Sequence, residues 1–392
     1  MSAALAAPLH ERREAPAARG LDALFVLNNL SVGGSERKTV RVANALQERG
    51  GHIGIAYLNA PDTLRSEVQA SIPVWCLHRT GKYSFAATTR LREILRRERV
   101  ATVVSVNSYP ALYVAAATRR LPEPPRTVAL MNTTAYRSGE RWRRGLYRRV
   151  LGFMDCTVYG CEVQRGIWLP RGDRLWQRSR VIYNGVEPER FAAITGPGGE
   201  CRERFDIPGR RFVFGTVGRL AAEKNQGVLI DALAKLRERG VDAHLIVVGD
   251  GPERDALIRR AALHDVAPWI TFTGALSDVR PALAAMEVFV LPSLAETFSN
   301  AALEAMAMAL PVVLTPTGGA SEMVGEAEGI ILGGADLVDA IVRALHALHA
   351  DAERRRRMGA AARERVRSVF SWHAMIDAYA ALLLDRRGMV HG

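Results

Sequence analysis

Two glutamates eight residues apart, Glu296 and Glu304, occupy a segment with the pattern of a strand, a polar loop and a helix. The strand is predicted to end at Pro292, and the helix to begin near Ser299 or Asn300, because both residues are good N-caps. Glu296 would lie in the loop and Glu304 about one turn into the helix, beside an apolar stripe. A carboxylate in such a setting needs hydrogen-bond donors, and the two hydroxyls of a ribose would be suitable.

The start of this predicted helix is a candidate anion site. The amides of Phe298, Ser299 and Asn300 are expected to point out of the helix start, where a phosphate or a polar sugar edge binds well. The alternative interpretation of the two glutamates is a solvated loop carboxylate and a surface-helix carboxylate. Their position between this strand and this helix favours ligand binding.

Two cations follow an earlier predicted strand. Arg219 and Lys224, in the segment GRLAAEKNQ, stand where a loop meets a helix start. Together they could clamp a diphosphate and stabilise it as a leaving group, although an ordinary exposed Arg and Lys would give the same pattern. The sequence contains no Asp-x-Asp pair, so we expect no metal site and no cofactor apart from a donor substrate. It also contains no Gly-x-Gly-x-x-Gly after a strand, which weakens a dehydrogenase interpretation.

A third loop, Asn28–Glu36, follows the first predicted strand. Gly33 and Gly34 would allow its backbone to approach a ligand closely, and Ser35 could cap the next helix. The loop would form the opposite wall of a ligand cleft. A purely structural Gly-Gly turn is an equal alternative.

Short apolar runs alternate with amphipathic stretches along the chain, which predicts parallel sheets wrapped by helices. The pattern occurs twice. The predicted strands are Leu21–Leu27, Ile53–Leu58, Ala101–Val106, Thr127–Leu130, Phe212–Val217, Leu245–Val248, Ile270–Phe272, Val288–Leu291 and Pro311–Leu314. Helices are predicted over Ser35–Arg49 and Asn225–Arg239.

The resulting fold class is α/β, with two doubly wound, Rossmann-like domains facing each other across a cleft. The predicted organisation is a disordered tail (1–20), an N-terminal acceptor-side domain (21–194), a linker (195–209), a C-terminal nucleotide-sugar-binding domain (210–370) and a final helix (371–388). The linker prediction rests on the Gly/Pro-rich run Thr195–Glu200.

Charge is uneven along the chain. Residues 1–185 carry 29 Lys and Arg against 14 Asp and Glu, whereas residues 186–392 carry 24 against 27. The first part therefore suggests an acidic partner: nucleic acid, anionic lipid headgroups or an acidic acceptor. The four cysteines show no metal-ligand spacing, and no apolar run is long enough for a membrane helix. We expect a cytoplasmic protein, with a possible peripheral location at the inner face of the plasma membrane.

The segment Arg137–Met154 is predicted to form a basic helix. Trp142, Leu146, Val150 and Phe153 would share one side, and arginines crowd the remainder. One hypothesis is a peripheral contact with an anionic membrane that carries a lipid-linked acceptor. The alternative is a core-facing apolar stripe with a solvated arginine face.

Five segments, in order, resemble the retaining GT-B glycosyltransferases known as glycosyl transferases group 1, or family four. They are GG-x-E near the start, VIYNGV at 181–186, GRLAAEKNQ at 218–226, VVGDGPER at 247–254, and the segment with Glu296 and Glu304. The resemblance covers roughly residues 21–385, and its C-terminal motifs are the more specific.

The resemblance implies roles for individual residues. Arg219 and Lys224 would hold the donor diphosphate, Glu304 the ribose, and Glu296 the donor sugar near its reacting face. Backbone contacts would come from Phe298, Ser299 and Asn300, and Gly34 would lie near the phosphates and the acceptor. The final helix, Trp372–Leu384, would cross back to the first domain.

Three residues depart from the family pattern. Asn132 stands where many relatives carry a His, which puts any His-dependent role in doubt. Thr297 begins a segment where a Gly-Phe-Gly type sequence is commoner, and Ala309 replaces a frequent Gly.

The sequence as a whole predicts a retaining, metal-independent glycosyltransferase. It would use a nucleoside-diphosphate sugar and a glycan or lipid-linked acceptor, in bacterial exopolysaccharide, capsule or lipopolysaccharide synthesis, and we expect no nucleic-acid partner. The alternatives are a nucleotide-sugar epimerase or a phosphorolytic enzyme on the same fold, or a catalytically weak binding subunit of a glycosyltransferase complex.

Overall fold

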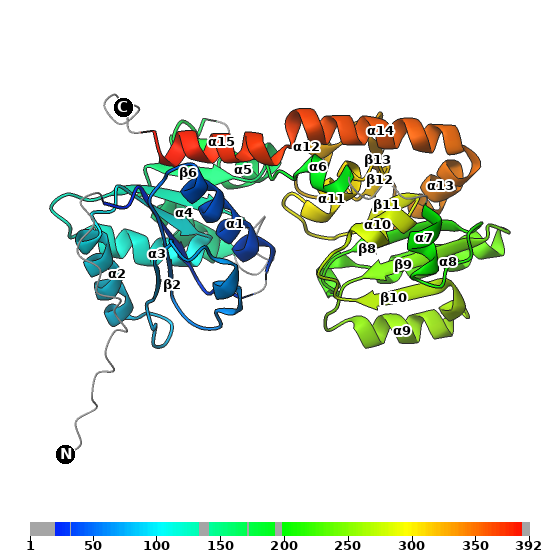
Figure 1. Ribbon diagram of the computed structural model, residues 1–392, viewed down its shortest axis with the longest axis horizontal. Helices are drawn as coiled ribbons and strands as arrows, with labels where there is room; N and C mark the ends of the chain where they lie inside the picture. Colours follow the sequence, from blue (N-terminus) through cyan, green and yellow to red (C-terminus); the bar gives the residue numbers. More distant parts are fainter. Residues whose placement is uncertain (1–19, 32, 133–140, 171, 193–197, 386–392) are drawn as a thin grey trace, which may run out of the picture. The chain divides into compact units, whose positions relative to one another are not determined.

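The computed structural model describes residues 20–31, 33–132, 141–170, 172–192 and 198–385 (Figure 1). By its internal contacts the chain divides into two compact units, Met1–Val128 and Ala129–Gly392.

In the described part of the chain, seven strands form the first sheet, in the order β3-β2-β1-β4-β5-β6-β7. Neighbours β1 and β2, β1 and β4, β2 and β3, and β6 and β7 run parallel. The strands are β1 (Ala23–Leu27), β2 (Ile53–Tyr57), β3 (Val74–Cys76), β4 (Thr102–Val106), β5 (Arg126–Met131), β6 (Cys156–Tyr159) and β7 (Ser179–Val181).

Residues 198–385 hold the second sheet, whose six strands have the order β10-β9-β8-β11-β12-β13. Every neighbouring pair is parallel. The strands are β8 (Phe212–Val217), β9 (Ala243–Val248), β10 (Ile270–Gly274), β11 (Val288–Leu291), β12 (Val312–Leu314) and β13 (Gly329–Ile331).

Helices connect the parallel strands, as crossover connections require. Those associated with the first sheet are α1 (Gly34–Glu48), α2 (Phe85–Arg97), α3 (Ser108–Thr118), α4 (Arg141–Leu151) and α5 (Glu162–Trp168), followed by α6 (Pro188–Ala192) and α7 (Gly198–Glu203). The remaining helices are α8 (Gly227–Glu238), α9 (Arg254–Leu263), α10 (Arg280–Ala285), α11 (Asn300–Ala307), α12 (Ala320–Met323), α13 (Leu337–Ala350), α14 (Ala352–Val369) and α15 (Trp372–Leu383).

Complete burial of the central strands explains their unbroken apolar sequences. All five residues of β1 and of β2 are buried. Helix α8 packs its leucines into the core beside the second sheet, and Leu229, Leu233 and Leu236 are fully buried. The chain leaves α8 at Gly240, whose φ of 78° is readily adopted by glycine.

A short stretch before the second sheet and the end of the chain are hydrogen-bonded to each other. The amide of Val186 donates to the carbonyl of Phe370, and the amide of Trp372 donates to the carbonyl of Val186. A carboxylate supports the same region: Glu322 of α12 accepts hydrogen bonds from the amides of Glu162 and Val163 at the start of α5, each at 2.8 Å. The hydroxyl of Tyr183 also donates to Glu322, at 2.9 Å.

The predicted strands are confirmed to within two residues at each end, and β8 and β11 match their predicted bounds. Four further strands, β3, β6, β7 and β13, were not predicted. One detail of the sequence interpretation is wrong: Ser35 does not cap α1, because the helix begins at Gly34 and Gly33 holds the cap position. The domain and linker boundaries stay predictions, and residues 1–19, 193–197 and 386–392 lie outside the described residues.

The predicted basic helix corresponds to α4, which ends at Leu151 and not at the predicted Met154. Its predicted apolar side is not uniformly packed: Val150 is buried, whereas Leu146 is 39% exposed and Phe153, beyond the helix end, is 63% exposed. The side chain of Trp142 and residues 137–140 lie outside the described part. None of the helices that could be searched is long and apolar enough to span a bilayer.

Candidate functional site

The strand order of the second sheet locates a ligand crevice. The chain runs outward from β8 through β9 to β10 and then returns to the other side of β8 as β11. Parallel sheets of this kind bind ligands beyond the carboxyl ends of the strands at such a reversal. The two loops that leave β8 and β11 carry the sequence-predicted cations and carboxylates.

An ion pair joins these two loops. The Nζ atom of Lys224 lies 2.5 Å from Oε2 of Glu296, and a backbone hydrogen bond from Leu294 to the carbonyl of Glu223 ties the loops together at 2.8 Å. Both side chains are largely buried, with exposures of 22% and 19%. The structure therefore brings together a cation and a carboxylate that are 72 residues apart in sequence.

Arg219 belongs to the same β8 loop but is more open to solvent. Its Nη2 atom lies 2.5 Å from Oε1 of Glu223, and its side chain is 66% exposed. The pKa of Glu223 lies below its ordinary value because its carboxylate accepts a hydrogen bond from its own backbone amide and another from Arg219. The buried side chain of Gln226 donates to the carbonyl of Arg219 at 2.9 Å and fixes the loop backbone.

The VVGDGPER segment supports this loop from the β9 side. A Cβ atom on Gly249 would lie 2.0 Å from the carbonyl oxygen of Gly218, and one on Gly251 would lie 2.3 Å from that of Leu220. Both glycines have positive φ values. Only glycine can bring the β9 loop so close to the β8 loop, so the motif shapes the support beneath Arg219.

The loop after β11 ends at the start of α11. Ser299 caps the helix, and its hydroxyl accepts a hydrogen bond from the amide of Ala302 at 3.2 Å. Within the described residues, the amides of Phe298, Ser299 and Asn300 have no acceptor. Unused amides at a helix start favour an anionic or polar ligand.

Glu304 lies one turn into α11, as predicted, and is half-buried. Its neighbours Leu303 and Ala305 are completely buried. The predicted apolar stripe is confirmed, because Met306 and Ala307 are also fully buried and Leu310 is 6% exposed.

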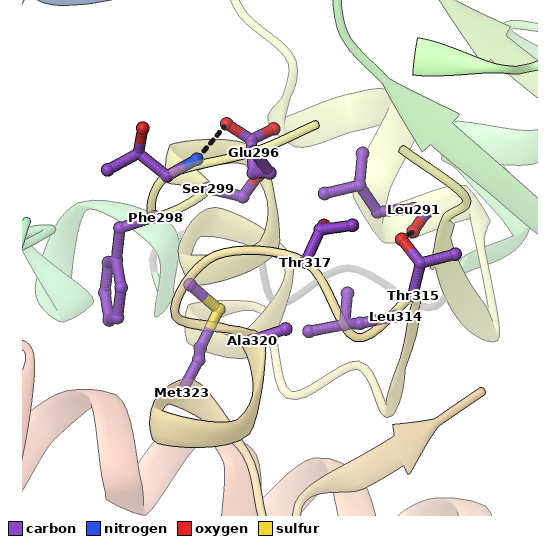
Figure 2. A pocket seen from close by; sticks show the side chains of 10 residues that line it. Leu291, Glu296, Phe298, Ser299, Leu314, Thr315, Thr317, Ala320 and Met323 are labelled. Carbon is purple, nitrogen blue, oxygen red and sulfur yellow. Dashed lines mark hydrogen bonds between the residues drawn. The ribbon is translucent and has the colours of Figure 1, made fainter. Parts of the chain in front are cut away.

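A small pocket lies beside Glu296 (Figure 2), and its volume of about 10 Å³ leaves room for a single water molecule. Its lining residues are Leu291, Glu296, Thr297, Phe298, Ser299, Leu314, Thr315, Thr317, Ala320 and Met323. Three of these, Glu296, Phe298 and Ser299, were predicted as site residues. Arg219, Lys224 and Glu304 are not among the pocket's lining residues.

The loop after β12 also lines this pocket. It was not among the site segments predicted from the sequence. A Cβ atom on Gly318, which has a φ of 54°, would lie 2.2 Å from the carbonyl oxygen of Glu296. The amide of Gly319 donates to the carbonyl of Thr297 at 2.8 Å. The sequence signal was present as TPTGG directly after the Pro311–Leu314 run, because two glycines after a buried strand indicate a close backbone approach.

Thr297 is a second feature that the sequence did not reveal. Its hydroxyl donates to the carbonyl of Asn132 at 3.0 Å, and its amide lies 3.3 Å from Oε1 of Glu296. The thiol of Cys161 lies 3.5 Å from the carbonyl of Thr297. Thr297 thus connects the loop that carries Glu296 to the ends of β5 and β6.

Gly33 and Gly34 lie in the loop between β1 and α1, in the first compact unit. A Cβ atom on Gly33 would meet the carboxylate of Glu36 at 2.4 Å, whereas one on Gly34 would meet nothing within 4 Å. The Ser35 hydroxyl donates to Glu36 at 2.8 Å. The roles of both glycines stay predictions, as do those of the other site residues.

Within the residues that the structure describes, no group of three or more His, Cys, Asp or Glu side chains is suited to a metal ion. Independence from metal stays a prediction, which the assay with a chelator proposed below tests.

Two family models match the chain. Residues 32–190 match the model described as Glycosyltransferase Family 4, and residues 211–351 match the one described as Glycosyl transferases group 1. Between them they include Gly33, Gly34 and all the predicted site residues of the second sheet.

Similar curated proteins include a lipopolysaccharide core biosynthesis glycosyltransferase, LpsE, from Rhizobium meliloti, which is 33% identical over 59% of this chain and 65% of its own length. A GDP-mannose-dependent α-(1-6)-phosphatidylinositol monomannoside mannosyltransferase from Mycolicibacterium smegmatis is 37% identical over 52% of this chain and 55% of its own. The matched part therefore spans about half to two thirds of these relatives.

Solved structures with the same fold cover almost the whole chain. Anabaena HepE in complex with UDP is 19% identical and superposes with a TM-score of 0.80 over 92% of this chain and 99% of its own. A glycosyltransferase from Rickettsia africae, also 19% identical, has a TM-score of 0.79 over 93% and 99% of the two chains. These likenesses show the GT-B fold, with two Rossmann-like domains.

Proposed function

We propose that this chain, which belongs to the group 1, family-four glycosyltransferases, transfers a sugar from a nucleoside-diphosphate sugar to a glycan or lipid-linked acceptor. The observation that carries the proposal is the joined pair of loops after β8 and β11. The Nζ atom of Lys224 in one loop lies 2.5 Å from Oε2 of Glu296 in the other. The second loop continues into the start of α11, where the backbone amides have no acceptor in the described residues. Such a combination suits a ligand with both phosphates and sugar hydroxyls.

Lys224 and Arg219 would stabilise the diphosphate as it leaves. In the proposed step the bond between the anomeric carbon and the phosphate oxygen breaks, and the acceptor oxygen forms the new bond on the same face. The leaving phosphate takes the acceptor's proton. Cations that face the developing charge lower the barrier because their attraction strengthens in the transition state.

The partners of Lys224 and Arg219 suggest how the site would accept a donor. Each cation is paired with a glutamate: Lys224 with Glu296, and Arg219 with Glu223. A diphosphate would compete for both cations, which would release Glu296 toward the hydroxyls of the transferred sugar. Glu304, one turn into α11, would then hold the ribose.

The donor class has support from relatives. HepE was crystallised with UDP and with UDP-glucose, and the mycobacterial relatives are described as GDP-mannose-dependent. LpsE is described as acting in lipopolysaccharide core biosynthesis. We therefore propose a surface-polysaccharide or glycolipid pathway, with retention at the anomeric carbon and no metal requirement.

Ligand-induced thermal shifts would test the proposal. UDP, GDP, ADP and their sugars should be compared, because a ligand that binds only the folded state raises its melting temperature. One of these series should stabilise the chain in the presence of EDTA, and Lys224→Ala should lose most of that shift. A chain that responds to none of them would refute the donor proposal.

Turnover of the best donor then separates the alternatives. Release of the nucleoside diphosphate only with an acceptor would support transfer, and loss of this activity in EDTA would contradict metal independence. Donor conversion without any acceptor would instead indicate an epimerase. Binding without turnover would indicate a binding subunit. The membrane contact of the predicted basic helix, which includes α4, also stays a hypothesis, and its test is combined with the vesicle experiment below.

A further inference from the structure

Two aromatic side chains at the start of α2 are exposed to solvent. Phe85, the first residue of the helix, is 85% exposed, and Tyr83 is 69% exposed. A single exposed apolar residue is ordinary on a soluble protein. Here, however, two aromatic rings border a hollow in the surface of the first compact unit.

Helices α2 and α3 pack against each other (Figure 1), and residues of both helices and their ends line the hollow. We call it the α2–α3 groove, and its volume is about 640 Å³. Its lining residues are Tyr83, Ser84, Phe85, Thr88, Arg92, Leu112, Tyr113, Ala116, Arg119 and Arg120. Apolar and aromatic groups thus share the groove with three arginines.

Hydrogen bonds hold the backbone around the groove in place. The hydroxyl of Ser84 caps α2 by accepting a hydrogen bond from the amide of Ala87, and Tyr113 accepts one from the amide of Ser84. Arg92 donates to the carbonyl oxygens of Ala116 and Ala117 at the end of α3. Phe85 is therefore presented by a fixed helix start and not by a loose loop.

The segment of the chain that forms the groove is strongly positive. Residues 82–120 contain eight Lys and Arg against two Glu. Lys82 is exposed next to Tyr83, and Arg119 and Arg120 are exposed at the end of α3. Cations therefore occur next to the exposed aromatic pair and in the lining of the same groove.

We propose that the α2–α3 groove docks the protein onto an anionic phospholipid bilayer. Phe85 and Tyr83 would enter the interface between headgroups and acyl chains, and Lys82, Arg119 and Arg120 would contact lipid phosphates. Exposed aromatic rings flanked by cations match an anionic membrane interface, where apolar burial and charge attraction add. The proposal concerns the first compact unit and does not depend on the proposed sugar transfer.

Co-sedimentation of the full chain with vesicles tests the proposal. Vesicles of phosphatidylcholine, with and without phosphatidylglycerol, should be compared at low and at physiological salt. We expect binding that requires phosphatidylglycerol and weakens as salt rises, because salt screens exposed charges. No binding to phosphatidylglycerol vesicles at low salt would overturn the proposal.

Matched variants then locate the contact. Phe85→Ser should lower the vesicle partition coefficient about 10-fold or more, because the burial of a Phe side chain in the membrane interface would contribute strongly to the binding free energy. Leu263→Ser in α9 removes another apolar side chain that is 83% exposed, and it should change little. Tyr83→Ser provides a second aromatic variant if Phe85→Ser fails to fold, and melting curves would identify that failure.

Charge reversal gives an independent measurement. Lys82→Glu/Arg120→Glu should lower binding more than 10-fold, because each cation near an anionic surface contributes about a factor of five. Arg356→Glu/Arg357→Glu in α14 makes the same charge change on side chains that are 75% and 66% exposed. An equal loss of vesicle binding in this control pair would show that net charge alone drives binding, and it would overturn the proposal that the groove is the contact.

Two competing outcomes are also decisive. Loss of binding in Phe153→Ser, with Phe85→Ser unaffected, would assign the contact to the α4 region and contradict the groove. Concentration-dependent self-association without vesicles that Phe85→Ser abolishes would show that a second copy of the chain occupies the groove. Unchanged donor turnover without vesicles in Phe85→Ser would support a docking role distinct from catalysis.

Discussion

The loops after β1 and β8 leave the first strand of two sheets whose central strand orders correspond, yet their contents differ. The loop after β8 carries Arg219 and Lys224, and it is joined by an ion pair to the loop after β11. The loop after β1 contains Gly33 and Gly34. The nearby carboxylate of Glu36 accepts a hydrogen bond from the hydroxyl of the neighbouring Ser35. The same topology therefore supports a charged site in one case and a backbone-lined loop in the other.

This difference teaches that strand order fixes where a site lies but not what it holds. In both sheets the strand order reverses beside the first strand, which brings the carboxyl ends of two neighbouring strands together. The chemistry comes from side chains in the following loops. We expect the second sheet to bind the diphosphate and the first loop to contribute through its backbone, and the predictions below test that contrast.

The largest expected effect is in the second sheet. Lys224→Ala and Glu304→Ala should each lower turnover about 100-fold or more, because they remove leaving-group and positioning contacts. Steady-state release of the nucleoside diphosphate would measure this. Lys235→Ala in α8, which breaks an exposed ion pair with Asp339 of α13, is the matched control and should retain activity. Rates like those of the unmodified chain in both site variants would refute the site.

A smaller effect is expected for the glycine loop of the first sheet. Gly34→Ala adds a methyl group in open space at the start of α1, so melting temperature should stay equal or rise. If the backbone there approaches a ligand closely, turnover should nevertheless fall about 10-fold. Gly166→Ala in α5 also places its Cβ in open space and serves as the control. Full activity of Gly34→Ala would remove the first loop from the site.

Thr297 should show a smaller effect still. Thr297→Val removes the hydroxyl that donates to Asn132 at 3.0 Å, a hydrogen bond worth about 1 kcal/mol. We expect kcat to fall about five-fold with little change in donor KM, because Glu296 loses orientation rather than charge. Thr297→Ser keeps the hydroxyl and should restore the rate. Equal kcat values for Thr297→Val and Thr297→Ser would show that this hydrogen bond has no positioning role.

The smallest effect concerns Ala309, which departs from the family pattern. Its φ of 59° is unfavourable for a residue with a side chain. Ala309→Gly should therefore raise stability by less than about 1 kcal/mol, since glycine also loses more entropy on folding. Thermal melting would measure a rise of about 1–2 °C. Ala301→Gly, in α11, should instead lower it. A lower melting temperature for Ala309→Gly would contradict the strain.

Sequence patterns predicted the central strands well because burial on both faces leaves unbroken apolar runs. The run Phe212–Val217 became β8 without any change in its bounds. The strands that were missed are short: β3, β7 and β13 have three residues each and lie at sheet edges, and β6 has four. Three or four residues are too few to establish a period, and among strands of this length in the described residues only β11 and β12 were predicted.

The site residues were predicted individually, but their contacts were not. The pairing of Lys224 with Glu296 depends on two loops that meet only because β8 and β11 are neighbours. Arg219 and Glu223 are four residues apart, but they do not share a helix, so the helical rule for this spacing could not predict their ion pair. The bond from Thr297 to a main-chain carbonyl leaves no trace in residue types.

The carboxylate of Glu322 has a practical consequence for anyone who wishes to express half of this molecule. It satisfies two amides at the start of α5 and the hydroxyl of Tyr183, all of which precede the predicted linker. A fragment that began after that linker would leave Glu322 without these donors, and the complementary fragment would leave the α5 amides without their acceptor. The gene should therefore be cloned as one uninterrupted reading frame.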